Sequence, residues 1–111
     1  MDFGIQLATS SHHWKVVKCA EELGFTHAWF YDTQLLNADP FVVMAAAAMH
    51  TARIKLCTGV LIPSNRIAPV TANALASLNA LAPGRIICGI STGSIVISRP
   101  TRGISQITAA I

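Results

Sequence analysis

The order of extended and helical segments is the feature of this sequence that most constrains its fold. Runs of alternating β-type residues are separated by longer helical patterns, and successive extended runs begin about 25 to 30 residues apart. We expect strands at residues 2–8, 27–31, 53–60 and 85–90, and helices at 12–23, 40–50 and 69–81. This order predicts an α/β fold with about four parallel strands joined by crossover helices.

Local signals mark the ends of these helices. Asp39 before Pro40 is typical of a capping side chain followed by proline at the first helical position. Gly24 stands where a helix commonly ends in a left-handed residue. A serine in the polar turn 9–11 is expected to cap the first helix, and the Pro83-Gly84 pair is expected to end the third.

The pattern ends after Gly93. A fourth helix is due, yet residues 94–98 have the character of a strand and residues 99–103 that of a turn. Residues 104–111 are weakly apolar and carry neither an amphipathic period nor a cap. We therefore divide the chain into a βα domain at 1–93 and a tail of different pattern at 94–111.

The composition points to a protein that associates with a partner. Of the 111 residues, 52% are hydrophobic and only 12% are charged, against about 25% charged in an average domain. The apolar run 41–49 is too short to span a membrane. The net charge of +3 is not arranged as a basic stripe with aromatic residues, so we expect no nucleic-acid partner.

The cysteines and the N-terminus indicate a cytoplasmic protein. Cys19, Cys57 and Cys88 are odd in number, widely spaced and set among apolar residues, which favours reduced core thiols over disulfides or metal ligands. The first residues show no basic stretch followed by an apolar core, so we expect no signal peptide. No metal site is predicted.

Polar residues gather at the predicted carboxyl ends of the strands. In parallel βα proteins ligands bind at these ends, and here they carry residues 8–10, 32–34, 59–66 and 91–93. No Ser-His-Asp order, metal-ligand spacing or phosphate-cradling glycine loop occurs, so no catalytic residue is assigned. The Ser91-Thr92-Gly93 sequence is by itself a weak phosphate signal.

Three of these residues admit two interpretations each. Asp32 is either a polar anchor or acid–base group near a ligand, or a turn residue bonded to the backbone of the next loop. Arg66 either pairs with a phosphate or carboxylate, or is a solvated surface residue. Gly59 is either a bulge that lets a flat ligand approach, or a bend needed for packing.

Several short segments, taken in order, resemble the bacterial luciferase-like oxidoreductases. The branch most suggested is the deazaflavin-dependent reductases related to methylenetetrahydromethanopterin reductase. The likeness covers roughly residues 1–93. The segments that carry it are DFGI at 2–5, AEELGF at 20–25, WFYD at 29–32, TGV at 58–60 with Pro63 and Arg66, LAPGR at 81–85 and GISTG at 89–93.

The resemblance implies a (βα) TIM barrel that binds FMN or a deazaflavin, coenzyme F420, at its carboxyl face. It implies hydride transfer or oxygenation of a small-molecule substrate, with the cofactor performing the chemistry. It also implies that the third strand carries a bulge, with a cis bond at Gly59–Val60, behind the flavin ring. The residues it assigns to the cofactor are Asp32, Thr58, Gly59, Val60, Arg66, Ser91, Thr92 and Gly93.

The length departs from the family. A complete barrel has on the order of 250 residues, so we expect a chain truncated after the fourth of eight strands, with little or no activity alone. Four parallel strands leave open edges and a bare face, which predicts a homodimer or higher oligomer. The alternative is a non-catalytic, self-associating half-barrel.

Overall fold

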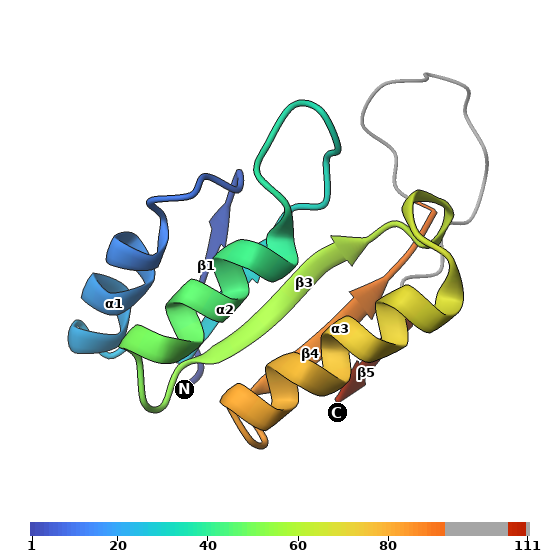
Figure 1. The fold of residues 1–111 in the computed structure, drawn as a ribbon. Helices are drawn as coiled ribbons and strands as arrows, with labels where there is room; N and C mark the ends of the chain where they lie inside the picture. The colour runs from blue at the N-terminus through green and yellow to red at the C-terminus, as the bar shows by residue number, and fades with distance from the viewer. Residues whose placement is uncertain (93–106, 111) are drawn as a thin grey trace.

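The computed structural model describes residues 1–92 and 107–110. Four βα-type strands, three helices and a short 3₁₀ turn alternate along the chain before a fifth strand (Figure 1). The strands are β1 (Gly4–Leu7), β2 (His27–Phe30), β3 (Lys55–Leu61), β4 (Ile86–Ile90) and β5 (Ile107–Ala110). The helical elements are α1 (Trp14–Glu22), α2 (Pro40–His50), η1 (Pro63–Asn65) and α3 (Ala68–Leu81).

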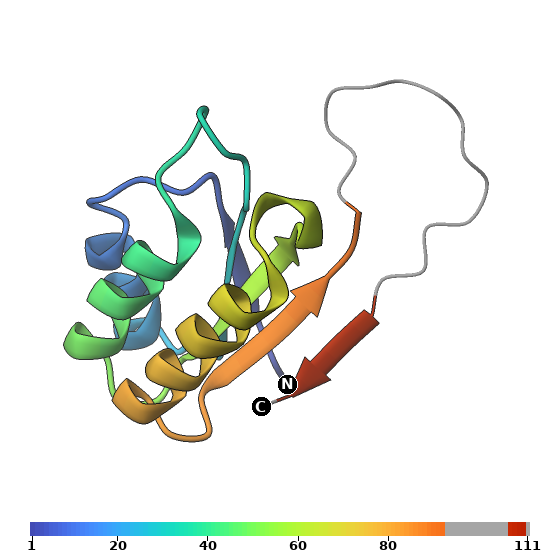
Figure 2. The ribbon, with the colours of Figure 1, turned by 45° about the vertical axis from the view of Figure 1, so that its right-hand side comes forward.

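The sheet follows the order of the sequence. Its strand order is β1-β2-β3-β4-β5, and β1 to β4 are parallel neighbours. The three helices all lie on one face of this sheet, and no helix of residues 1–92 covers the other face (Figures 1 and 2). The predicted α/β class with four parallel strands is therefore confirmed, and the arrangement is that of a partial (βα) barrel.

The structure confirms the predicted helix-end signals at Asp39 and Gly24 and contradicts the predicted serine cap. Asp39 caps α2 as predicted, because its Oδ1 accepts a hydrogen bond from the Phe41 amide at 2.8 Å. Gly24, with φ +91°, follows α1 in the left-handed region as expected. The predicted serine cap is wrong: residues 11–13 form a turn closed by a bond from His13 N to Ser10 O, so the helix begins two residues late, without a side-chain cap.

The apolar helix α2 contacts elements on its inner side and flanks but keeps an exposed outer face. It packs against α1, α3 and β3, and its inner residues Val43, Met44 and Ala47 are buried. Its outer residues Val42 and Met49 are 65% and 67% exposed. Within the described residues, none of the helices has both the length and the apolar character needed to cross a membrane.

The hydrophobic core fills the layer between the sheet and the helices. Alternate residues of each parallel strand point into this layer, as the period of a strand requires. The largest fully buried apolar side chains come from strands and helices alike: Phe30, Met44, Ile54, Leu56, Leu61, Ile86, Val17 and Val43.

The helix-free face of the sheet is covered in part by one tryptophan. A Cβ built on Gly4 or Gly59 would lie 3.1 Å from the Trp29 ring, and one on Gly89 would lie 3.7 Å from it. The His27 ring is stacked near it, 6.4 Å between centroids. Because three glycines lie beneath it, the indole can spread across neighbouring strands instead of standing away from the sheet.

The segment after residue 92 is described only in part. The strand expected at 94–98 and the turn expected at 99–103 lie outside the described residues. β5 pairs antiparallel with β4, with Ile107 opposite Ile90 and Ala110 opposite Ile87. The division of the chain at residue 93 stays a prediction.

The start of β3 is held by a carboxylate from α1. Both Glu21 oxygens accept from the Ala52 amide at 3.0 and 3.1 Å, and Oε2 also accepts from Arg53 N at 2.6 Å and Ile54 N at 2.7 Å. Burial raises the pKa of Glu21, but these amide bonds outweigh burial and leave the pKa below its ordinary value of 4.5. Folding therefore favours the ionised carboxylate.

We expect Glu21→Gln to lower the free energy of unfolding at pH 7 by about 1 kcal/mol, because charged acceptors make the stronger bonds and solvent screens this half-exposed site. Because the pKa of Glu21 is lower in the folded chain than in the unfolded chain, its ionised carboxylate stabilises the fold fully at a pH above the unfolded pKa. This stabilisation is lost as the pH falls through the pKa of the folded chain. The deficit of the variant should therefore shrink below about pH 4.5. Urea unfolding from pH 7 to pH 3 measures it.

The exposed neighbour Glu22 provides the matched control, since it lies on the same helix. Glu22→Gln should change stability by less than about 0.5 kcal/mol at any of these pH values. Equal effects of the two substitutions would contradict the role given to Glu21.

Candidate functional site

The structure brings the four polar strand ends to one edge of the sheet. Thr9 Oγ1 after β1 donates to Tyr31 O at 2.6 Å. Ile62 N after β3 donates to Asp32 Oδ2 at 2.9 Å. Ser91 N after β4 donates to Leu61 O at 3.1 Å. These bonds link the exits of β1 to β4 in series, so the predicted clusters form one continuous rim.

A bulge interrupts the pairing of β3 with β4 at this rim. Thr58 is paired with Cys88 and Leu61 with Ile90. Two residues of β3, Gly59 and Val60, therefore lie opposite Gly89 alone. The Gly59–Val60 peptide bond is cis, as the resemblance implies. Both residues are half-buried.

The two strands approach each other closely beside the bulge. Thr58 is fully buried, and its Oγ1 donates to Gly89 O at 2.8 Å. A Cβ built on Gly89 would lie 2.5 Å from the Thr58 carbonyl oxygen, far inside van der Waals contact. Residue 89 must therefore be glycine for this geometry. We did not predict Gly89 as a site residue, although it lies within the GISTG segment.

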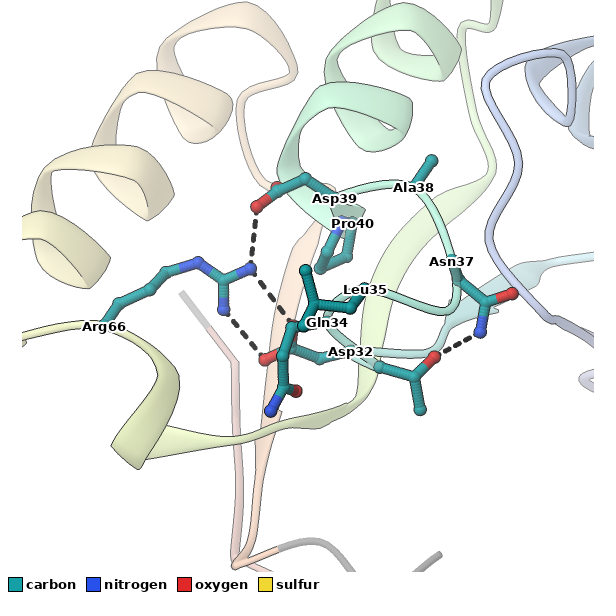
Figure 3. A pocket seen from close by; sticks show the side chains of 9 residues that line it. Asp32, Gln34, Leu35, Asn37, Ala38, Asp39, Pro40 and Arg66 are labelled. Carbon is teal, nitrogen blue, oxygen red and sulfur yellow. Dashed lines mark hydrogen bonds and ion pairs between the residues drawn. The ribbon is translucent and has the colours of Figure 1, made fainter.

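Asp32 lies at the centre of a hydrogen-bond cluster (Figure 3). The residue is 3% exposed. Its Oδ2 accepts from Ile62 N, from Arg66 Nη1 at 2.8 Å and from Asn65 Nδ2 at 3.4 Å, while its Oδ1 accepts from Arg66 Nη2 at 3.1 Å. Asp32 thus bonds the backbone of a following loop, as one of its two interpretations expected, and its role near a ligand stays a prediction.

Arg66 is held inside this cluster and is not a solvated surface residue. Its side chain is 14% exposed, and Nη2 also donates to Asp39 Oδ2 at 2.8 Å. The guanidinium carbon lies 4.8 Å from the centroid of the Phe41 ring. The hydrogen bond to Asp32 is the main factor that raises the pKa of Arg66 above its ordinary value. Asp39 was predicted as a helix cap but not as a partner of Arg66.

A pocket of about 170 Å³ lies beside the cluster. The loop between β2 and α2 curves around it, and Arg66 closes one side (Figure 3). The loop is braced by a bond from Asn37 Nδ2 to Thr33 Oγ1, and Leu35 at its tip has φ +65° and is fully exposed. Polar side chains, one guanidinium and the apolar residues Leu35, Ala38 and Pro40 line this small cavity at the carboxyl edge of the sheet.

The remaining predicted site residues have different positions. Ser91 and Thr92 follow β4 at the rim, half-buried and exposed respectively. Gly93 lies outside the described residues. Cys57 precedes Thr58, but burial raises the pKa of its thiol to about 12, so it is not a nucleophile at neutral pH. The rim thus offers backbone groups, hydroxyls and an ion cluster in which one guanidinium faces two carboxylates. Such groups suit ligand binding more than proton transfer.

The fold and this rim define the class as part of a (βα) barrel with its ligand edge at the carboxyl ends of the strands. The model of the luciferase-like monooxygenase family matches residues 5–104. The chain belongs to that family.

Two relatives and two solved structures illustrate the likeness. The chain is 38% identical over 96 residues to 5,10-methylenetetrahydromethanopterin reductase of Methanolobus tindarius. It is 42% identical over 82 residues to F420-dependent glucose-6-phosphate dehydrogenase of Intrasporangium calvum. It superposes with TM-score 0.73 and 32% identity on the F420-dependent tetrahydromethanopterin reductase of Methanopyrus kandleri. An FMN complex of a Baeyer–Villiger monooxygenase from Pseudomonas putida, at TM-score 0.76 and 18% identity, shares the fold alone.

The chain spans only a part of each of these proteins. The matches cover 84% and 67% of this chain but 29% and 25% of the two relatives. The structural matches cover 84% and 86% of this chain and 27% and 30% of the two solved chains. The family model ends within the segment that we separated at residue 94.

We expect Gly89→Ala to destabilise the protein by about 1 to 3 kcal/mol, because the added methyl group meets a backbone carbonyl that cannot turn aside. Urea unfolding measures the change. Gly4→Ala is the matched control: its Cβ would meet the Trp29 side chain at 3.1 Å, which can shift, so the loss should be smaller. A Gly89→Ala variant as stable as Gly4→Ala would contradict the close approach.

Proposed function

We propose that this chain forms the cofactor-facing strands of a luciferase-like oxidoreductase that uses coenzyme F420 or FMN for hydride transfer or oxygenation of a small molecule. The observation that carries the proposal is the bulge at Gly59–Val60, placed at the carboxyl edge next to the end of β4. A flat ligand needs close access to the backbone, and a bulge that begins with glycine carries no side chain of its own at that residue. The Trp29 ring, 3.1 Å from a Cβ built on Gly59, would form part of the same surface.

The residues at the rim fit such a cofactor. Gly59 and Val60 are half-buried, and Ser91 and Thr92 place hydroxyl groups at the neighbouring strand end. We propose that these residues form one wall of the cofactor site, with the buried Thr58 behind it as the residue that fixes β3 to β4. Gly93, which the resemblance also assigns to the cofactor, lies outside the described residues. A bound flavin or deazaflavin would supply the redox chemistry. The chain's own part would be to orient the ring and keep water from one of its faces.

The names of the relatives favour the deazaflavin. The M. kandleri and I. calvum proteins are described as F420-dependent, whereas FMN appears in a neighbour that shares the fold alone. We therefore propose coenzyme F420 first and FMN second. The cluster of Asp32 with Arg66 would lie beside the bulge.

We also propose that the chain alone has little or no activity. It spans less than a third of the length of its relatives, so the loops that would complete the site and meet a substrate belong to the rest of the barrel. Three free cysteines, two of them buried, support a reducing, cytoplasmic setting.

The second candidate is a self-associating half-barrel without catalytic function. The free edge of β1 favours it: Phe3 O and Leu7 O bond to the β2 side, so the backbone groups of Gly4 and Gln6 point outward. No proline or charged residue lies within β1 to discourage pairing with another strand. A homodimer or higher oligomer would cover this edge and the helix-free face.

Titration with F420 and, separately, with FMN tests the first candidate. We expect saturable changes in cofactor fluorescence with a dissociation constant on the order of 10 to 100 μM, because one wall of a site binds weakly. The surface variant Glu22→Gln should bind equally. A folded chain that changes the fluorescence of neither cofactor would exclude this candidate and leave the second.

Light scattering tests self-association. We expect a mass of at least twice the 11.8 kDa of one chain. Gln6→Pro removes an outward-pointing amide at the free edge and should shift the equilibrium toward the monomer, provided that circular dichroism shows the fold intact. A monodisperse monomer of the unaltered chain would contradict self-association.

A further inference from the structure

The hydrogen bonds of Asp32 hold the exit of β3 to the exit of β2. The bond from Ile62 N to Asp32 Oδ2 begins two residues after the bulge. Arg66, four residues further along the chain, returns to both oxygens of the same carboxylate. The segment that follows the bulge is therefore fixed at two points to one buried side chain.

Arg66 extends this connection to a third element. Its Nη2 also bonds to Asp39, which caps the first turn of α2. The exits of β2 and β3 and the start of α2 are thus joined through a single guanidinium. A shift of any one of them would break bonds to the other two.

The charges around Arg66 oppose a second role as an anion contact. Nη1 donates to Asp32, and Nη2 donates to both Asp32 and Asp39. One positive charge faces two carboxylates within hydrogen-bonding distance, so the cluster is net negative when all three groups are ionised. A phosphate that approached it would meet repulsion from the carboxylates and a guanidinium that already makes three hydrogen bonds to them.

We propose that Asp32 and Arg66 are positioning residues that hold the bulge against the flat ring of the cofactor, and that Arg66 does not bind the anionic tail. This inference rests on the proposed function. Loss of either residue should then weaken binding of the ring itself, whether or not a phosphate is attached to it.

FMN and riboflavin separate the two roles, because they differ only in the phosphate. For Asp32→Asn and Arg66→Ala we expect the dissociation constants of both ligands to rise by about tenfold, with their ratio within about twofold of the unaltered chain. An Arg66→Ala variant that loses affinity for FMN but keeps its affinity for riboflavin would overturn the proposal, since that pattern marks a direct phosphate contact.

Glu21→Gln is the matched control that separates a loss of overall stability from a specific loss of ligand binding. Glu21 also bonds backbone amides of the β3 segment, but at the opposite end of the strand. This variant should be destabilised yet bind riboflavin within about twofold of the unaltered chain. Equal losses of riboflavin affinity in Glu21→Gln and Asp32→Asn would show that any loosening of β3 suffices, and would overturn a specific role for Asp32.

Hydrogen exchange of the apo protein gives a readout that needs no ligand. In Asp32→Asn we expect exchange of the Ile62 amide to accelerate by about tenfold, with no such change in Glu21→Gln. If the unaltered chain binds none of F420, FMN and riboflavin, the proposed function fails. The exchange result still decides whether Asp32 holds the exit of β3. Unchanged protection at Ile62 would overturn the inference.

Discussion

The structure depends on how β3 is held, because this strand lies between β2 and β4 and carries the bulge. Glu21 fixes the backbone at its start, and Asp32 fixes the backbone at its exit. Both are carboxylates that accept hydrogen bonds from backbone amides, and such charge-assisted bonds are among the stronger hydrogen bonds in proteins. Between these two points, the buried contact of Thr58 with Gly89 sets the distance to β4. The ligand edge is therefore shaped from both ends of one strand.

The architecture could be predicted from the sequence because it depends on local patterns. Alternating β-type runs and the Asp39-Pro40 cap are properties of neighbouring residues, and they placed α2 at residues 40–50, where the structure has it. The serine cap failed for a reason of the same local kind: an additional turn at residues 11–13 delays α1. Helix ends commonly merge with a turn, so local signals locate them only to within one or two residues.

The candidate site was predicted in its location but not in its contacts. The polar strand ends identified the rim, since parallel strands place their carboxyl ends together. The partners of Arg66 depend on distances between residues 27 and 34 positions apart in the chain, which periodicity does not encode. Gly89 was missed for a related reason: the need for glycine arises from the carbonyl of Thr58 on the neighbouring strand. Sequence reasoning thus located the groups and left their pairing open.

The two faces of the sheet differ in how far the described residues cover them. The helix side is complete, because α1, α2 and α3 cover a continuous core. The other side carries Trp29 above three glycines, and among the described residues no strand pairs with the outward edge of β1. In a full (βα) barrel that side is the interior and that edge is closed by another strand. The carboxyl rim, by contrast, is joined strand to strand by its own hydrogen bonds. A rim of this kind can keep its shape when the barrel is incomplete, whereas the described residues place only Trp29 over the glycines of the other face.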